Sequence, residues 1–364
     1  MTGLAILGST GSIGQSTLNV VRRQRRFRVV ALTADQSAEA LAAQVAEFRP
    51  AMHGLVARDG PGCLIAAATH PEVQVVVNAV VGAAGLDATL AALEAGKRVA
   101  LANKESLVTA GELVLEAAAR GGGLIVPIDS EHSAVLQCLA GGGRETLTRL
   151  TLTASGGPFR AWTPDQVAAA TVSEALNHPT WAMGRKISVD SATLANKALE
   201  VIEAHHLFGL GYDAIHVVVH PQSIIHALCE FSDGSVLAQL GFPTMELPIL
   251  YALTHPERLP DGGVRRFDPV AAGSLTFEPV RHDAFPTFAL GVAAGRAGGT
   301  APTVFNAANE VAVQAFLDGR VAFGRIPAVI EQALAAHTPV PADRLETVRQ
   351  VDQWARVAAE VACC

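Results

Sequence analysis

The chain has 364 residues, of which 50% are hydrophobic and 17% are charged, and its formal net charge at pH 7 is −7. This balance is typical of a globular protein with a large buried core and excludes a disordered or fibrous chain. The acidic net charge and the absence of a long basic run argue against nucleic acid as the main partner.

The five cysteines lack metal-binding spacing and indicate a reducing compartment. The first predicted strand begins near Leu4, which leaves no room for a targeting segment, and polar residues or glycines interrupt the most apolar stretch. These features predict a cytoplasmic protein without a transmembrane span.

The first predicted strand, residues 4–7, runs into the glycine-rich segment GSTGSIG at residues 8–14. A helix over residues 13–23 and a strand over 28–32 complete a βαβ unit. In such a unit, glycines let the backbone approach a pyrophosphate, and the helix N-terminus receives its charge. A tight turn without a ligand is the alternative, since the spacing is not the common G-x-G-x-x-G.

The residues after the second strand bear on the choice between NAD and NADP. Asp35 lies where an acid would bind the ribose hydroxyls of NAD, and neither Gln36 nor Ser37 is basic. The general rule therefore favours NAD.

Strands and helices continue to alternate. Helices are predicted over residues 38–48, 86–95 and 106–120, and strands over 54–57, 73–79 and 98–101. Asn103 and Lys104 follow a strand at the edge where open α/β sheets bind ligands. Asn103 could be only a helix cap and Lys104 only a solvated residue, but a lysine at this edge could also hold a substrate oxygen.

A short strand at residues 124–126 precedes Asp129, Ser130 and Glu131. If the strand continues, the two carboxylates share one face at a separation of about 6–7 Å, where their repulsion favours a bound cation. The alternative is a helix N-terminus with Ser130 as cap and Glu131 in the first turn.

Beyond residue 143 the composition changes. A strand over 150–154 ends in Ser155-Gly156-Gly157-Pro158, a turn that could hold an anion. The segment HPTWAMG at 178–184 places Trp181 and Met183 between a proline and a glycine, which predicts a lid over a bound ligand.

A helical pattern follows over residues 194–207, with Asn196, Lys197, Glu200 and Glu203 on one side. A solvated face with a Lys–Glu pair is the usual interpretation. The neighbouring Ser191 and the donors Asn196 and Lys197 instead suit a phosphate, and Glu200 would add a third carboxylate to Asp129 and Glu131. Oxygen ligands alone select Mg²⁺ or Mn²⁺ rather than zinc.

Strands are predicted over 215–219, 224–229 and 235–239, and helices over 306–317, 326–337 and 344–361. The predicted fold class is α/β, with an N-terminal Rossmann-type parallel sheet, an α+β catalytic domain and a C-terminal helical bundle. The predicted boundaries are 1–125 for dinucleotide binding, 126–265 for the catalytic domain, 266–285 for a linker and 286–364 for the helices.

Several segments, in order, resemble the 1-deoxy-D-xylulose 5-phosphate reductoisomerase family. They are GSTGSIG, LANKESLV, PIDSEH, SGGPF, HPTWAMGRKISVDSATLANKALEVIEA, HPQSIIH, DGSVLAQLG and NAANE. The resemblance covers nearly the whole chain, and the combination is far more specific than any single glycine motif.

The resemblance implies a role for each matching residue. For NADPH it implies Thr10, Gly11, Ser12, Ile13, Asn103, Glu105 and Gly184, and for the metal Asp129, Glu131 and Glu200. For the substrate phosphate it implies Ser155, Ser191, Asn196 and Lys197, and for the substrate body Lys104, Ser130 and His178. Glu131 and Glu200 would also contact substrate, Trp181 and Met183 would form the lid, and Lys104 and the three acids would be catalytic.

The chain departs from the family where Asp35-Gln36-Ser37 replaces a Gly-Lys-Asn-like turn, so Ser37 and backbone N–H groups would hold the 2′-phosphate. The implied activity is the rearrangement and NADPH-dependent reduction of 1-deoxyxylulose 5-phosphate to 2-C-methylerythritol 4-phosphate, on the methylerythritol phosphate route to isoprenoids, by a homodimer. The alternatives are a metal-independent dehydrogenase of the homoserine or dihydrodipicolinate reductase kind and a non-catalytic dinucleotide sensor.

Overall fold

The computed structural model describes residues 1–181 and 183–364, which form two compact units. The first unit comprises Met1–Ser106, Leu113–Gln137 and Thr244–Phe267, and the second comprises Leu107–Glu112, Cys138–Pro243 and Asp268–Cys364. These units do not test the predicted domain boundaries, which stay a prediction.

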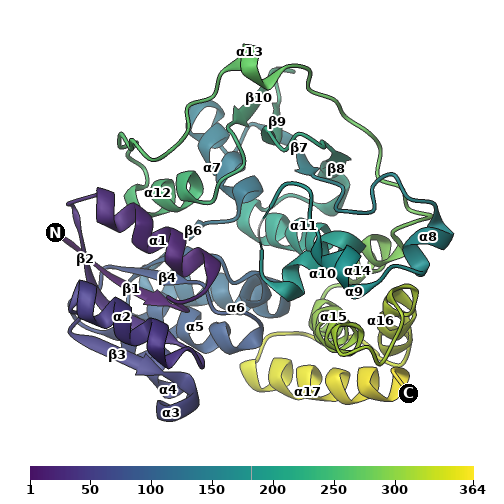
Figure 1. The fold of residues 1–364 in the computed structure, drawn as a ribbon, viewed down its shortest axis with the longest axis horizontal. Helices are drawn as coiled ribbons and strands as arrows, with labels where there is room; N and C mark the ends of the chain where they lie inside the picture. The colour runs from purple at the N-terminus through teal and green to yellow at the C-terminus, as the bar shows by residue number, and fades with distance from the viewer. Residues whose placement is uncertain (182) are drawn as a thin grey trace. The chain divides into compact units, whose positions relative to one another are not determined.

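A six-stranded parallel sheet in the order β3-β2-β1-β4-β5-β6 forms the centre of the first unit (Figure 1). Its strands are β1 (Thr2–Leu7), β2 (Phe27–Ala34), β3 (Met52–Leu55), β4 (Val75–Asn78), β5 (Arg98–Leu101) and β6 (Leu124–Pro127). The order reverses between β1 and β4, and at such a switch point open α/β sheets bind ligands at the carboxyl ends of their strands.

Helices alternate with these strands and bury the apolar strand residues. They are α1 (Ser12–Arg23), α2 (Ala38–Phe48), α3 (Val56–Asp59), α4 (Gly62–Thr69), α5 (Leu86–Glu94), α6 (Lys104–Gly121), α7 (Ser130–Gly142) and α12 (Glu246–Thr254). α1 packs against α12 and α4 against α5. Leu4, Ile6, Leu32 and Val77 are fully buried in this core, as expected for a parallel sheet covered by helices.

The second unit contains a mixed four-stranded sheet in the order β10-β9-β7-β8. Its strands are β7 (Leu147–Ala154), β8 (Ile215–Val219), β9 (Ile225–Phe231) and β10 (Val236–Leu240). β7 pairs in parallel with β8 and antiparallel with β9, and β10 pairs antiparallel with β9. β10 is therefore an edge strand of this sheet.

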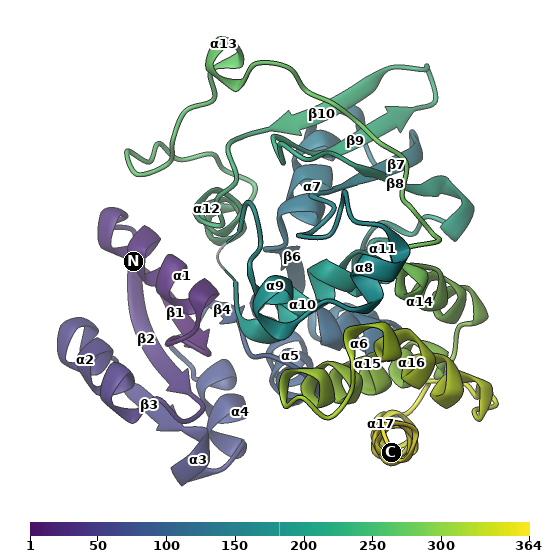
Figure 2. The ribbon, with the colours of Figure 1, turned by 45° about the vertical axis from the view of Figure 1, so that its right-hand side comes forward.

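The helices of the second unit are α8 (Pro164–Ala168), α9 (Val172–Leu176), α10 (Arg185–Thr193), α11 (Ala195–Phe208), α13 (Pro269–Ala272), α14 (Pro286–Ala297), α15 (Ala301–Leu317), α16 (Ile326–Ala335) and α17 (Leu345–Ala362). α15 packs against α16 and α17 at the yellow end of the chain (Figure 2). The predicted fold class is thus confirmed: a Rossmann-type sheet, an α+β part and C-terminal helices.

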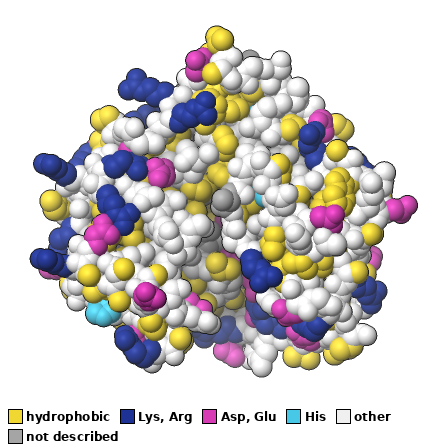
Figure 3. Space-filling model, viewed as in Figure 1, with side chains coloured by type: hydrophobic (Ala, Val, Ile, Leu, Met, Phe, Trp, Pro, Cys, Tyr) yellow, Lys and Arg dark blue, Asp and Glu magenta, His cyan; other side chains and the backbone are white. Residues whose placement is uncertain are grey.

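The surface agrees with the composition. On the face shown in Figure 3, basic side chains are interspersed with acidic ones rather than forming a continuous basic tract. Among the described residues, no helix combines the length and the apolar character that crossing a lipid bilayer requires.

The turn after β1 explains the glycines of the first motif. Gly8 has φ +78°, a conformation that favours glycine. A Cβ added at Gly14 would lie 2.4 Å from the carbonyl oxygen of Gly8 and 2.5 Å from Cα of Ser9, so α1 begins in direct contact with the end of β1. Gly11 stands at the N-cap of α1, and no side chain caps this helix.

We predict that Gly14→Ala lowers the free energy of unfolding by about 1–3 kcal/mol, because the new methyl group would overlap backbone atoms that cannot move independently. Gly62→Ala is the matched control. At Gly62 nothing lies within 4 Å of an added Cβ, so the substitution should be neutral or stabilising. Chemical denaturation of both variants measures the difference, and equal effects would contradict the close packing of this turn.

Candidate active site

Four predicted cofactor residues lie in the turn that begins α1. Thr10 and Ile13 are half-buried, and Gly11 and Ser12 are exposed. Because the N-cap residue Gly11 has no side chain and no other side chain caps this helix, the first backbone N–H groups of α1 are available to an anion. The cradle therefore fits the pyrophosphate of a dinucleotide.

The other predicted cofactor residues lie at three places. Ser37 is exposed at the N-cap of α2, directly after β2, and Gly184 is exposed at the N-cap of α10 in the second unit. Asn103 is 1% exposed: its Oδ1 accepts from the Ser106 N–H, and its Nδ2 donates to the carbonyl oxygen of Val80 and to Oε2 of Glu105. Asn103 thus caps α6, as the alternative interpretation proposed, and also ties it to the loop after β4.

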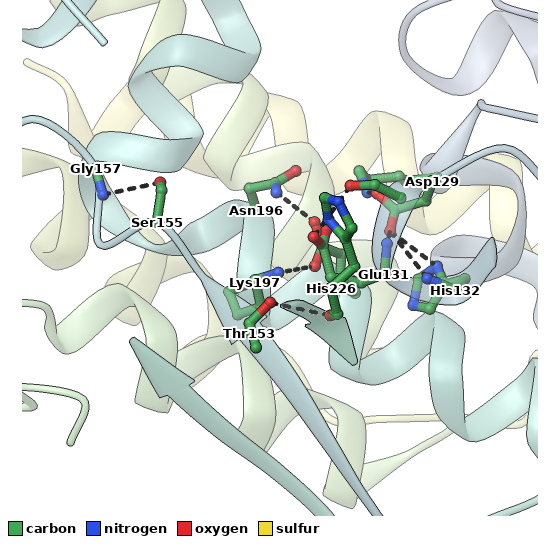
Figure 4. Close-up of polar contacts among 12 residues, drawn as sticks. Asp129, Glu131, His132, Thr153, Ser155, Gly157, Asn196, Lys197 and His226 are labelled. Atoms are coloured by element: carbon green, nitrogen blue, oxygen red, sulfur yellow. Dashed lines mark hydrogen bonds and ion pairs between the residues drawn. The ribbon is translucent and has the colours of Figure 1, made fainter. Parts of the chain in front are cut away.

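The strand interpretation of Asp129 and Glu131 is wrong. β6 ends at Pro127 and α7 begins at Ser130, since the Oδ1 atom of Asp129 accepts from the N–H groups of Glu131 (3.0 Å) and His132 (3.3 Å) (Figure 4). Asp129 rather than Ser130 therefore accepts the hydrogen bonds from the backbone N–H groups in the first turn of α7. The Ser130 hydroxyl instead donates to Oε1 of Glu131 at 3.0 Å. The carboxylates are brought together by a helix start rather than by strand alternation.

Lys104 forms an ion pair with Asp129 within the first unit. The lysine is 8% exposed, so the interpretation of a solvated first-turn residue is wrong. A lysine buried this deeply keeps its charge only beside an anion, and Asp129 supplies one.

α11 carries the corresponding group of the second unit. Asn196 Nδ2 donates to Oε1 of Glu200 at 2.5 Å, and the Lys197 ammonium group pairs with Oε2 of the same carboxylate (Figure 4). Lys197 is 5% and Glu200 1% exposed, so this side of α11 is buried rather than solvated.

Asp129 and Glu131 of the first unit and Glu200 of the second are the acidic residues that could serve as ligands of a metal ion. Glu200 is buried and the other two are half-buried, and a donor set of carboxylate oxygens fits a hard divalent cation.

The SGGP turn carries Ser155, which meets His178 of the predicted lid segment. The Nδ1 atom of His178 accepts from the N–H groups of Thr180 (3.1 Å) and Trp181 (2.9 Å), which leaves the proton on Nε2. Nε2 then donates to Ser155 Oγ at 3.0 Å, and this oxygen also accepts from the Gly157 N–H. The hydroxyl hydrogen of Ser155 is therefore available to an acceptor such as a phosphate oxygen.

Gly157 of the SGGP turn packs against α10. Gly157 has φ +67°, and an added Cβ would lie 2.7 Å from the carbonyl oxygen of Ser191 on α10. Trp181 and Met183, predicted as the lid, are both half-buried, and Ala182 between them lies outside the described residues.

Sequence reasoning missed one buried polar contact. Asp190, on α10, is 1% exposed and accepts from Nδ2 of Asn309 on α15. Both residues lie in segments quoted above, and a charged or amide residue among Ala, Val and Thr is the signal that could have singled them out.

Burial lowers the pKa of His178 from 6.5 to about 4. Between these values the unfolded chain binds more protons than the native one, so the free energy of unfolding falls as the pH falls from about 6.5 to about 4. His178→Gln should flatten this pH dependence, and His53→Gln, at an exposed position, should not. Urea unfolding at several pH values measures both slopes, and equal slopes for the two variants would contradict the neutral state of His178.

Three family models match the chain. The model described as 1-deoxy-D-xylulose 5-phosphate reductoisomerase matches residues 4–59 and 52–111, that of its C-terminal domain matches 125–208, and a further DXP reductoisomerase C-terminal domain matches 240–358. The 1-deoxy-D-xylulose 5-phosphate reductoisomerase of Ralstonia nicotianae is 50% identical over 99% of this chain and 98% of its own length. That of Geobacillus kaustophilus is 49% identical over 98% of each chain.

Solved structures agree. A DOX-P reductoisomerase in complex with NADPH, fosmidomycin and magnesium superposes with a TM-score of 0.93 at 40% identity, covering 100% of this chain and 98% of the other. The Zymomonas mobilis enzyme in complex with NADPH gives a TM-score of 0.91 at 38% identity, covering 100% and 99%. From its glycine turn to its C-terminal helices, the chain belongs to the 1-deoxy-D-xylulose 5-phosphate reductoisomerase family.

Proposed function

We propose that the protein rearranges 1-deoxy-D-xylulose 5-phosphate and reduces the product to 2-C-methyl-D-erythritol 4-phosphate, using NADPH and a divalent metal ion. The observation that carries this proposal is the group of three carboxylates, Asp129, Glu131 and Glu200, in a chain that also has a dinucleotide-binding turn. Relatives of this name and related structures that hold NADPH and magnesium support it.

Asp129, Glu131 and Glu200 would hold the metal, Mg²⁺ or Mn²⁺. The bound ion would act as a Lewis acid toward oxygens of the substrate. Ser130 would help to orient this group, because its hydroxyl donates to Oε1 of Glu131 at 3.0 Å. Lys104, held by Asp129, would place a positive charge where negative charge develops on the substrate.

Ser155, Ser191, Asn196 and Lys197 would hold the substrate phosphate. Phosphate binding energy realised away from the reacting carbons orients the substrate body. The chain supplies hydroxyl, amide and ammonium donors from the SGGP turn and from the two helices α10 and α11. Each of these donor types suits a phosphate oxygen.

His178 would connect the phosphate region with the lid. Its neutral imidazole donates to Ser155 and accepts from the backbone N–H groups of Thr180 and Trp181. The ring is therefore hydrogen-bonded both to the SGGP turn and to the lid segment. Trp181 and Met183 would close over the substrate and exclude water from the intermediate that awaits reduction.

NADPH would bind at the start of α1 through Thr10, Gly11, Ser12 and Ile13, with Asn103, Glu105 and Gly184 further along the cofactor. Ser37, exposed after β2, would be available to its 2′-phosphate. The Asn103 side chain makes hydrogen bonds to the loop after β4, at Val80 and Gly82, and to Glu105 of α6, and these bonds would fix that loop beside the cofactor.

The experiment that tests the function follows NADPH absorbance with 1-deoxyxylulose 5-phosphate and Mg²⁺. Turnover should stop on addition of EDTA and return with Mg²⁺ or Mn²⁺, and NADH should be the weaker reductant. Activity that survives EDTA would favour a metal-independent dehydrogenase. Binding of NADPH without turnover would favour a dinucleotide sensor.

Within the same assay, Glu200→Gln should lower kcat by about 100-fold or more, because a neutral amide is a poor ligand for a hard cation. NADPH binding, measured by fluorescence, should persist. Glu116→Gln, at an exposed position on α6, should leave kcat unchanged. Near-normal turnover of the Glu200 variant would remove the three-carboxylate metal site from the proposal.

We further propose that the protein is a cytoplasmic homodimer whose interface includes β10. This edge strand presents Val236 and Leu237, which are 50% and 40% exposed. An exposed apolar edge strand is a template for pairing with another chain.

Sedimentation at micromolar concentration should therefore give twice the mass of one chain. Leu237→Lys should shift the equilibrium toward the monomer, since it places a charge on the edge. Leu115→Lys, at an apolar position on α6 that is 38% exposed, should leave the mass unchanged. A monomeric wild-type protein would refute the proposal.

A further inference from the structure

The buried carboxylate of Asp190 makes one contact within its own helix and one contact to another helix of the second unit. Its Oδ2 lies 2.9 Å from Nζ of Lys186, one turn earlier on α10, and its Oδ1 accepts from Nδ2 of Asn309 on α15 at 2.8 Å. Asp190 is 1% exposed and Asn309 is fully buried. Burying a carboxylate is costly unless it is paired and hydrogen-bonded, and here both conditions are met.

The next residue along α10 is Ser191. Successive residues of an α-helix are rotated by about 100°, so the direction of Ser191 follows from the rotation of α10 about its axis. The contact between Asp190 and Asn309 fixes this rotation against α15. At roughly 4 Å from the helix axis, a 20° rotation would move the Ser191 hydroxyl by about 1.4 Å.

The junction that follows Asp190 is also held by hydrogen bonds. The Thr193 hydroxyl donates to the carbonyl oxygen of Asp190 at 3.2 Å and accepts from the Ala195 N–H at 3.2 Å. Leu194 between them has φ +58°, and α11 begins directly after it. The placement of Asn196 and Lys197 therefore depends on the same stretch of backbone as that of Ser191.

We propose that Asp190 is a positioning residue for phosphate recognition: by binding Asn309 and Lys186 it sets the orientation of Ser191 and of the start of α11. This inference rests on the proposed function. The carboxylate of Asp190 binds Asn309 on α15 and Lys186 on its own helix, so the role that we assign to it is to position its neighbours. A misplacement of about 1 Å in a donor weakens substrate orientation substantially, which makes the contact matter beyond stability.

The test compares Asp190→Asn with wild type and with Asp318→Asn, an exposed control at the end of α15. For the phosphorylated substrate, KM should rise about tenfold or more while kcat changes less than about threefold. With unphosphorylated 1-deoxyxylulose, kcat/KM should stay within about twofold of wild type. An equal loss with both sugars would overturn the proposal, because it would point to a general structural defect.

A second readout does not need turnover. Inorganic phosphate should raise the Tm of wild type more than that of Asp190→Asn, and an equal rise would overturn the proposal even in an active enzyme. If wild type showed no turnover but phosphate still raised its Tm more than that of Asp190→Asn, the proposed function would be refuted and the role of Asp190 would not. If Asp190→Asn does not fold, Asn309→Ser takes its place, because this variant keeps the ion pair between Asp190 and Lys186. Its rise in Tm with phosphate should be smaller than that of wild type, but the loss should be less than that expected for Asp190→Asn. The double variant Asp190→Asn, Asn309→Asp, in which the two side chains are exchanged, should recover part of the rise in Tm with phosphate.

Discussion

The constraint that governs the site is the full or partial burial of acidic side chains, because a carboxylate withdrawn from water must be matched by a donor or a cation. In the first unit Lys104 meets Asp129, and in the second Lys197 and Asn196 meet Glu200. Asp190 repeats the arrangement with Lys186 and Asn309. The acids are thus held in defined orientations by neighbouring side chains, which is the preorganisation that catalysis by charged groups requires.

Much of the fold could be predicted from sequence because local pattern and burial agree. The helix at residues 38–48 and the strands at 98–101 and 215–219 have the predicted ends. α10 was missed because its sequence, RKISVDSAT, has few apolar residues at helical spacing and several residues that favour caps and turns. α12 was missed because it is apolar on all sides and contains a proline, so no amphipathic period marks it.

The candidate site could be predicted from the sequence only in part, because the motifs identified the residues but not the contacts between them. The motifs singled out Asp129, Glu131 and Glu200, yet the choice between strand and helix start after residue 127 depended on a hydrogen bond from backbone to Asp129. The side of α11 that carries Lys197 and Glu200 has the pattern of a solvated face, and only packing by distant segments makes it buried. Long-range contacts of this kind leave no local signal.

The left-handed backbone at Leu194 has a consequence for how this segment tolerates change in length. α10 ends and α11 begins at this single residue, with no linker to absorb an insertion. One extra residue placed after it would turn every side chain of α11 by about 100° around the helix axis. The count of residues between Ser191 and Glu200 is therefore as restrictive as their chemical identity, and the junction would tolerate substitutions at outward positions far better than an added or deleted residue.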